Sequence, residues 1–411
     1  MLAASSIARR ALARKASHAG GTASAAAQLA RRCQSTLSAR EAEALKGFPT
    51  VDVGGLMPDS PSERRDAAHA ELRKALVDED APGFFYALNA PETLNAKYLD
   101  SVYAFVEDAH ALPLRTKARF ADPERGSGEL GAAYNGPDVG YLEPSYDGVS
   151  VAAASAWDYS PEGAKKAGSD WDAELPSYFR ATMEDLYERQ NSVGRAVLTG
   201  IAEVLDLPPK TFSDSFDSGD LGTIRLISYP GFEKPVHTFS AANANSGDHA
   251  WTYYDDDDDD DDDLCQADIG IAPHTDFEAF TLMHQDAPGL QLLSRGELEK
   301  GKDGKWLDAP VVDAFIVIVG DILERYTNGV LRATPHRVVR RSASRRSIIR
   351  FNAVAPDAVV APLPAFGEPK YSPVTMDEHM ATTLGNLRKG VPSWDAQTNT
   401  SRSATYDYGG A

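Results

Sequence analysis

The sequence has few cysteines and no long apolar stretch. Only Cys33 and Cys265 occur among its 411 residues. Disulfide bonds therefore cannot organise the fold, and a cysteine-based metal site is excluded. No run approaches the roughly 18 to 20 uninterrupted apolar residues that span a bilayer, so we expect no membrane-embedded segment.

Positive charge is also scarce: 41 Lys and Arg stand against 61 Asp and Glu, and the formal net charge is -20. Because a phosphate backbone is bound by positive surface, nucleic acid is not expected as a partner. Much of the excess is one uninterrupted run, Asp255–Asp263. Adjacent like charges repel and cannot be buried, so the run predicts a solvated loop. A calcium site would need spaced ligands and a turn-forming glycine, which this homopolymer does not supply.

Over the whole chain, 42% of the residues are apolar and 25% are charged, which is typical of a globular protein. We expect one domain with extensions. Residues 1–40 contain no Asp or Glu, but they carry Arg and Lys in an Ala/Ser-rich background, which is typical of a mitochondrial transit peptide. If this segment is instead a disordered tail, a cytoplasmic location is expected.

Residues 41–390 are predicted to form the domain, and its amino-terminal part, 41–208, contains helices and short strands. At its start, Ser60 and Glu63 have the spacing of a capping box, with Pro61 at the first helical position. The other predicted elements are an extended segment at 49–53, a buried strand at 83–88 and a long amphipathic helix at 178–205.

Residues 209–374 change to short β-rich runs separated by Gly, Pro and Asn, without intervening helical patterns. This pattern predicts an antiparallel sandwich or barrel, with an acidic insertion at about 241–265. A terminal helix at 375–390 and a polar tail at 391–411 follow. The predicted strands are 223–229, 289–293, 315–319, 336–339 and 347–354.

His274 and Asp276 are two potential metal ligands in a predicted strand. Side chains at i and i+2 project from the same face of a strand, so both can point into one cavity. Taken alone, such a pair more often consists of surface polar residues. His336 lies 60 positions after Asp276, at the start of another strand. Two imidazoles and a carboxylate form the facial triad that holds ferrous iron and leaves positions open for substrates. His284 is not expected to be a ligand.

Arg345 and Ser347 form a second i, i+2 pair, in which a guanidinium and a hydroxyl share one strand face. Together they can clamp a carboxylate, because Arg presents a planar fork of donors. The alternative is an exposed basic edge strand.

Several ordered motifs resemble the non-haem iron(II), 2-oxoglutarate-dependent oxygenases of the isopenicillin N synthase-like type. The resemblance covers nearly everything from about Pro49 to Lys389. One block departs from the family pattern, because Asn89-Ala-Pro stands where the family usually has His-Gly. The matching motifs are Gly83-Phe-Phe-Tyr-Ala-Leu-Asn89, Arg225-Leu-Ile-Ser-Tyr229-Pro230, His274-Thr-Asp276, Gly289-Leu-Gln-Leu-Leu293, Gly320-Asp321, Asn328-Gly329, Thr334-Pro-His336 and Arg345-Arg-Ser347.

The resemblance implies a mainly β fold, a double-stranded β-helix (jelly roll) core flanked by helices. It implies Fe(II) held by His274, Asp276 and His336. It also implies 2-oxoglutarate as co-substrate, its distal carboxylate bound by Arg345 and Ser347, with a further contact from the Tyr229 hydroxyl. Such an enzyme uses O2 to hydroxylate, desaturate or cyclise a small organic molecule, releases succinate and carbon dioxide, and takes ascorbate as a reductant in vitro.

Two alternatives remain open: an iron oxidase of the same family that does not use 2-oxoglutarate, and a non-catalytic jelly-roll binding protein. The region 134–159, with Tyr141, Trp157 and Tyr159, is a candidate aromatic wall for the substrate, although such segments also form plain core. The substrate, the reaction outcome and the oligomeric state do not follow from the sequence.

Overall fold

The computed structural model describes residues 37–120, 140–142, 154–167, 175–216, 222–231, 269–294, 305–388, 391–395 and 400–404. Met1–Thr36 and Leu37–Ala411 are two separate units, and only the second contains described residues. The acidic run and most of the predicted transit peptide therefore lie outside the described residues. Helix α2 (Ala39–Ala44) begins within the segment 1–40, after a capping box made by Ser38 and Glu41, so the folded unit starts before residue 41.

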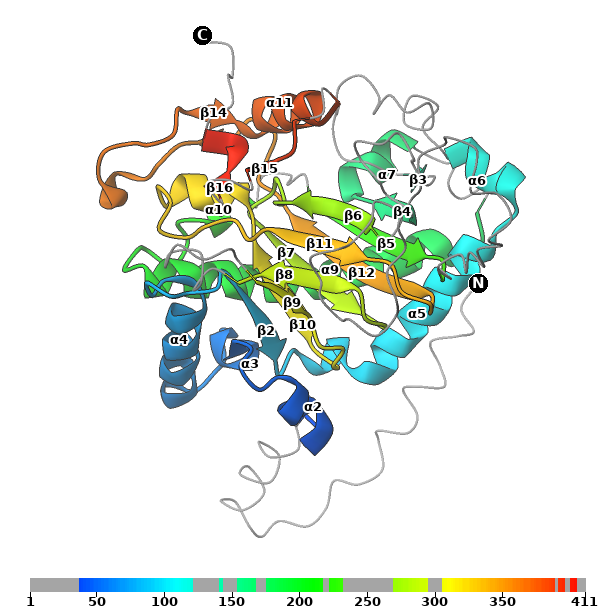
Figure 1. The fold of residues 1–411 in the computed structure, drawn as a ribbon, viewed down its shortest axis with the longest axis horizontal. Helices are drawn as coiled ribbons and strands as arrows, with labels where there is room; N and C mark the ends of the chain where they lie inside the picture. Colours follow the sequence, from blue (N-terminus) through cyan, green and yellow to red (C-terminus); the bar gives the residue numbers. More distant parts are fainter. Residues whose placement is uncertain are drawn as a thin grey trace, which may run out of the picture. The chain divides into compact units, whose positions relative to one another are not determined.

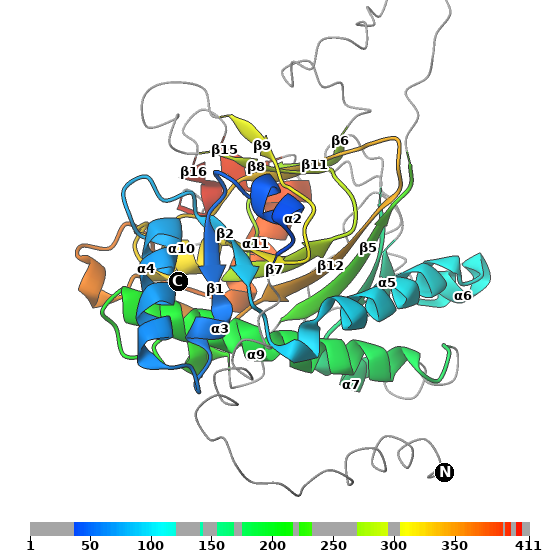
Figure 2. The same ribbon diagram turned by 90° about the horizontal axis from the view of Figure 1, so that it is seen from below.

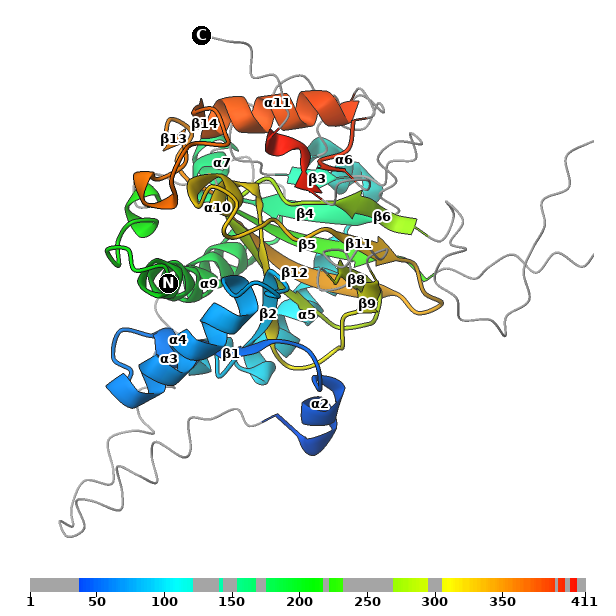
Figure 3. The ribbon, with the colours of Figure 1, turned by 60° about the vertical axis from the view of Figure 1, so that its left-hand side comes forward.

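Two sheets form the centre of this unit. Figures 1 and 3 show both sheets. Among the described residues one sheet has eight strands and the other has four, and every pairing between these strands is antiparallel except that of β1 with β2. In spatial order the larger sheet contains β1 (Thr50–Asp52), β2 (Phe84–Leu88), β10 (Phe315–Val319), β7 (Phe280–Gln285), β12 (Arg345–Asn352), β5 (Thr223–Tyr229), β4 (Ser155–Tyr159) and β3 (Gly140–Leu142). The smaller sheet contains β6 (Ile269–His274), β11 (His336–Val339), β8 (Leu290–Leu293) and β9 (Trp306–Asp308).

The two sheets pack face to face around an apolar interior. Ile227 and Ile316 of the larger sheet belong to the same buried cluster as Leu292 and Val338 of the smaller one. Successive side chains of a strand point to opposite faces. Leu226, next to Ile227, therefore lies in a second cluster on the outer face of the larger sheet. The predicted antiparallel sandwich is confirmed.

Helices cover that outer face, as Figure 2 shows for α5 (Ala96–Ala111) and α9 (Phe179–Val204). The apolar stripe of α9, which includes Met183, Leu186 and Val197, is buried against the sheet and against α4 (Ser62–Leu76). Long amphipathic helices bury such a stripe and leave their polar side in water. The predicted helix at 178–205 is confirmed.

The predicted capping box of α4 is wrong. The helix begins at Ser62, and Pro61 occupies the N-cap position without a side-chain cap. Ser60 is therefore one residue too early to bond the first turn, and its buried hydroxyl has no hydrogen-bond partner among the described residues. Its carbonyl instead accepts a hydrogen bond from Arg65.

Shorter elements complete the fold. Among the described residues, no helix is long and apolar enough to cross a membrane. The remaining helices are α3 (Val53–Leu56), α6 (Leu114–Phe120), α7 (Pro161–Ala167), α10 (Asp321–Tyr326) and α11 (Met376–Arg388), with 3-10 turns at Glu92–Leu94, Ser213–Ser215, Pro364–Phe366 and Arg402–Ala404. Two small hairpin-like pairs are β13 (Val359–Val360) with β14 (Val374–Thr375), and β15 (Trp394–Asp395) with β16 (Thr400–Ser401).

Candidate metal centre

His274, Asp276 and His336 come together at the end of the smaller sheet. His274 is the last residue of β6 and pairs directly with His336, the first residue of β11. Their ring centroids are 4.3 Å apart. Asp276 lies beyond the end of β6, so the prediction that it shares a strand face with His274 is wrong. Its side chain nevertheless faces both histidines, and its backbone carbonyl accepts a hydrogen bond from the Asp321 N–H at 2.9 Å.

One carboxylate oxygen faces both imidazoles. Asp276 Oδ1 is 3.5 Å from His274 Nε2 and 3.6 Å from His336 Nε2. All three ligand atoms lie within 4.8 Å of one another. Metal–ligand bonds to such atoms are about 2.0–2.2 Å long, so a cation between the carboxylate oxygen and either nitrogen can reach both. This donor set, with two nitrogens and one oxygen, suits a divalent transition metal.

The backbone fixes which nitrogen of each imidazole faces the centre. His274 Nδ1 lies 2.9 Å from the Ala272 carbonyl oxygen, and His336 Nδ1 lies 3.0 Å from that of Thr334. A carbonyl oxygen can only accept, so each Nδ1 carries the proton. Each Nε2 of the neutral ring therefore directs a lone pair toward Asp276, as metal-binding histidines do.

The electrostatics of the three groups keep the carboxylate ionised. Burial opposes the charge on Asp276, but the neighbouring His336 and His274 hold the pKa of this carboxyl below its usual range. Burial lowers the pKa of His336 to about 4. At neutral pH the aspartate is therefore an anion and His336 is a neutral ligand, which is the protonation state that metal binding requires.

Glu278 is a further buried carboxyl beside the triad. Burial, reinforced by the negative charge of Asp276, raises the pKa of Glu278 to about 8, against a smaller opposing effect of Arg225. Glu278 is therefore mostly protonated at neutral pH and adds little second negative charge to the centre. The sequence offers no pattern that singles it out.

Arg345, Ser347 and Tyr229 lie together inside the sandwich. Arg345 pairs with Tyr229 across β12 and β5, and its guanidinium is 5.0 Å from the Tyr229 ring centroid. Arg345 and Ser347 are 3% and 0% exposed. The alternative of an exposed edge strand is wrong, because β12 lies between β5 and β7 in the larger sheet.

Several polar atoms of this pair are buried and have no hydrogen-bond partner within the described ranges. They are Arg345 Nε and Nη1 and the Ser347 hydroxyl. Arg345 Nη2 does donate to Gln285 Oε1 at 3.1 Å. Buried polar groups are normally paired, since an unpaired one costs about 1–3 kcal/mol. The orphaned donors therefore indicate an anionic ligand, and a carboxylate fits a guanidinium beside a hydroxyl.

Comparison with known proteins supports the same chemistry. Residues 248–353, which include all three members of the triad as well as Arg345 and Ser347, match the family described as the 2OG-Fe(II) oxygenase superfamily. These residues thus form a domain of the 2OG-Fe(II) oxygenase superfamily within the chain. The protein is thus an oxidoreductase that uses Fe(II) and 2-oxoglutarate, as the resemblance implied.

Two relatives and one solved structure illustrate how far the likeness of this oxygenase extends. The chain is 26% identical to homoarginine-6-hydroxylase 2-ODD-C23 of Glycine max, over 81% of this chain and 95% of that one. It is 24% identical to codeine O-demethylase of Papaver somniferum, over 78% and 76%. The crystal structure of the dioxygenase for auxin oxidation in rice superimposes with a TM-score of 0.59, at 19% identity, over 86% of this chain and 99% of that one. The predicted jelly roll is confirmed.

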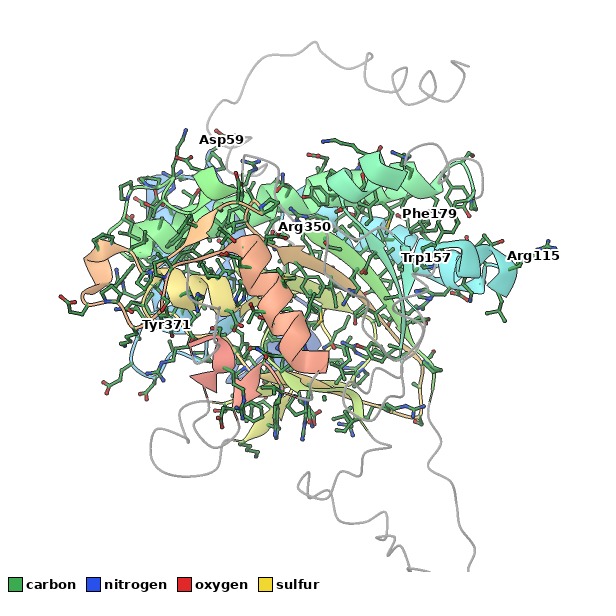
Figure 4. All side chains as sticks on the ribbon, turned by 90° about the horizontal axis from the view of Figure 1, so that it is seen from above. Asp59, Arg115, Trp157, Phe179, Arg350 and Tyr371 are labelled. Atoms are coloured by element: carbon green, nitrogen blue, oxygen red, sulfur yellow. The ribbon has the colours of Figure 1, made fainter. Side chains whose placement is uncertain are left out.

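Three further residues considered in the sequence analysis, His284 as a metal ligand and Trp157 and Tyr159 as substrate contacts, lie away from the metal centre. His284 belongs to β7, on the outer face of the larger sheet, where its Nδ1 lies 2.7 Å from the Tyr103 hydroxyl. It is not part of the triad, as expected. Trp157 and Tyr159 also face the helices and not the sandwich interior, and Trp157 packs against Phe179 at 5.0 Å (Figure 4).

The prediction that Trp157 and Tyr159 form part of an aromatic wall for the substrate is therefore wrong. Both lie on the face of β4 opposite to Ala156, which belongs to the interior cluster. The rest of the region 134–159 falls partly outside the described residues, and the Tyr141 side chain is among the parts not described.

Proposed function

We propose that this oxygenase oxidises a C–H bond of a small organic molecule, with Fe(II) held by His274, Asp276 and His336. The observation that carries the proposal is the convergence of two ligand Nε2 atoms on one Asp276 oxygen. When bound, the iron supplies the redox chemistry by which O2 oxidises 2-oxoglutarate to succinate and carbon dioxide and the substrate is oxidised in turn. Hydroxylation is the outcome we favour, and desaturation or ring closure would use the same site.

In this proposal Arg345 and Ser347 bind the distal carboxylate of 2-oxoglutarate. Their orphaned donors, buried inside the sandwich, would be satisfied by two carboxylate oxygens. Tyr229 lies against the guanidinium and would direct its hydroxyl to the same group. Gln285, which accepts from Arg345, fixes the orientation of the fork. The sequence did not single out Gln285.

The chain's own residues otherwise exclude water and fix protonation. Asp276 and His336 are 5% and 6% exposed, which strengthens every electrostatic interaction at the centre. The backbone carbonyls of Ala272 and Thr334 hold the Nδ1 protons in place. The three metal ligands are therefore already arranged for binding, and other residues around the centre would orient the substrate.

The substrate class we infer is a small metabolite. This fits a hydroxylase and an O-demethylase among the relatives. The test is a screen of candidate metabolites for substrate-coupled succinate release with Fe(II), 2-oxoglutarate and ascorbate. A metabolite that raises succinate formation and is itself oxidised supports the proposal. Product formation that depends on O2 but not on 2-oxoglutarate would instead indicate the oxidase alternative, and binding without turnover would indicate the non-catalytic one.

We further propose that residues 1–36 direct the protein to mitochondria. The proposal rests on their composition, cationic and free of Asp and Glu, and on the start of the folded unit at Leu37. Fusion of these residues to a fluorescent protein tests it. Mitochondrial fluorescence supports targeting, whereas diffuse fluorescence would indicate a cytoplasmic protein.

A further inference from the structure

The described carboxy-terminal part of the chain packs beside the metal centre. We use the name C-terminal segment for residues 391–395 and 400–404, which include β15 and β16. In Figures 1 and 2 both strands lie next to the smaller sheet. Three serines of this segment, Ser393, Ser401 and Ser403, are no more than 1% exposed. The predicted polar tail therefore contributes buried contacts.

Ser393 bonds to the residue that stands between two of the proposed ligands. Its hydroxyl donates to the Thr275 carbonyl oxygen at 2.9 Å and accepts from the Thr275 N–H at 2.9 Å. The Thr275 hydroxyl donates to the Ser393 carbonyl oxygen at 3.3 Å. Both residues are completely buried. Three hydrogen bonds thus join positions 118 residues apart in the chain.

These bonds fix both peptide planes that connect His274 to Asp276. The Thr275 N–H belongs to the peptide after His274, and the Thr275 carbonyl belongs to the peptide before Asp276. Because a peptide unit is planar, holding one of its polar atoms orients the whole unit. A single hydroxyl therefore sets the directions in which the two ligand side chains leave the backbone.

A second contact of the C-terminal segment lies beside the third ligand. Trp394 packs edge-on against Trp306 of β9, with ring centroids 5.9 Å apart. The Trp306 ring centroid in turn lies 4.3 Å from the guanidinium of Arg337, the residue after His336. Arg337 is 8% exposed and donates to Gln291 Oε1 of β8 at 2.6 Å.

The segment is itself held firmly. The Arg402 N–H donates to the Ser393 carbonyl at 2.7 Å, and the Arg402 side chain pairs with Asp395 at 3.2 Å. The buried Arg325 of α10 donates to the Ser403 carbonyl at 2.8 Å. These contacts hold the backbone of Ser393 in place, so its hydrogen bonds restrain the position of Thr275.

We propose that the C-terminal segment positions the metal ligands, with Ser393 as a positioning residue that acts through Thr275. The inference rests on the proposed iron site. Groups that orient metal ligands typically change metal affinity by about 10- to 100-fold when removed. Ser393 acts one residue away from the ligands, so we expect an effect of about 10-fold.

The test is an anaerobic titration of the full chain with Co(II), which fills sites of this type and reports its ligand geometry by visible absorption. Ser393→Ala should weaken Co(II) binding about 10-fold and alter the absorption spectrum. Thr275→Val removes one of the three hydrogen bonds. It should change the Co(II) affinity and the absorption spectrum in the same direction as Ser393→Ala, but by a smaller amount. This second variant keeps the test valid if Ser393→Ala does not fold.

Ser160→Ala is the matched control. The Ser160 hydroxyl is also fully buried and accepts one hydrogen bond, from the Gly163 N–H at 3.0 Å at the start of α7. This control should lower the melting temperature of the metal-free protein but leave Co(II) affinity and spectrum unchanged.

The outcomes separate the two proposals. If Ser393→Ala and Thr275→Val bind Co(II) like the unmodified protein, with the same spectrum, and differ only in melting temperature, the C-terminal segment has a merely structural role and the inference is overturned. If the unmodified protein binds no Co(II), the proposed iron site itself fails, and the inference fails with it.

Discussion

The Thr281 hydroxyl donates a hydrogen bond to Asp276 Oδ2, the carboxylate oxygen that does not face the two histidines. Thr281 lies on β7 in the larger sheet, whereas the histidines lie in the smaller sheet. The bond therefore connects the metal centre to the opposite wall of the sandwich. It leaves Oδ1 as the oxygen directed at both Nε2 atoms.

Thr281→Val tests this connection, because valine keeps the shape and removes the hydroxyl. We expect Fe(II) affinity to fall about 10-fold and the free energy of unfolding to fall by about 1.5–3 kcal/mol. Anaerobic metal titration and denaturant unfolding measure the two quantities. Thr383→Val is the control, since the buried Thr383 hydroxyl has no hydrogen-bond partner in the described part of the chain. Equal metal affinity in both variants would show that Thr281 does not orient Asp276.

Arg345→Lys tests the carboxylate clamp. Lysine keeps the charge but loses the fork of donors, so the KM for 2-oxoglutarate should rise about 10- to 100-fold. Arg346→Lys is the neighbouring control. Arg346 points to the other face of β12, where it pairs with Asp286 at 2.7 Å and Glu107 at 2.9 Å. Steady-state succinate formation should show the effect for Arg345 alone. If Arg345→Lys instead raises the KM of the principal substrate, and product forms without 2-oxoglutarate, the oxidase alternative is favoured.

Trp157→Phe tests the assignment of Trp157 to the core. Its indole N–H donates to the Ala109 carbonyl at 3.1 Å, and the ring packs between Phe179 and Phe120. The substitution should lower the free energy of unfolding by about 1–3 kcal/mol. The KM for 2-oxoglutarate and for the substrate should stay unchanged. A changed KM for the substrate, without a loss of unfolding free energy, would indicate that Trp157 contacts the substrate.

His110 predicts a pH dependence of stability. Burial lowers the pKa of His110 to about 4 in the folded protein, from an ordinary value of 6.5. Below pH 6.5 the unfolded chain binds a proton that the folded protein does not, so the free energy of unfolding decreases as the pH decreases. The contribution, on the order of 3 kcal/mol, is intact above about pH 6.5 and is lost as the pH falls to about 4.

His110→Gln should therefore show a shallower loss of unfolding free energy between pH 6.5 and 4. Glutamine can still donate to the Leu226 carbonyl, which His110 Nε2 contacts at 3.1 Å. Identical slopes for His110→Gln and the unmodified protein would contradict the assignment.

The strands were the most predictable part of the fold. The predicted bounds of 223–229, 315–319 and 336–339 agree with β5, β10 and β11. These strands are rich in β-branched residues, which favour an extended backbone, so local chemistry largely determines them. Helix α5, in contrast, was not predicted, although Leu99, Val102 and Val106 follow a helical period. The same helix contains aromatic residues, which strands also favour, so its local pattern is less distinctive.

The proposed ligands could be found because few residue types bind ferrous iron. Their geometry was predicted for the wrong reason: β6 ends at His274, so Asp276 meets the histidines from the irregular segment after the strand and not from a shared strand face. Thr281, Gln285 and Ser393 could not be found at all. Single polar residues far apart in the sequence carry no pattern, and only folding brings them to the centre.

The central claim is that one centre binds Fe(II) and 2-oxoglutarate through His274, Asp276, His336 and Arg345. An anaerobic titration of Fe(II) in the presence of 2-oxoglutarate tests it most directly, because iron chelated by a 2-oxo acid gives a visible charge-transfer absorption. We predict that the unmodified protein develops this absorption with one iron per chain, and that His336→Ala does not. An absorption of equal strength in His336→Ala, or none in the unmodified protein, would contradict the account.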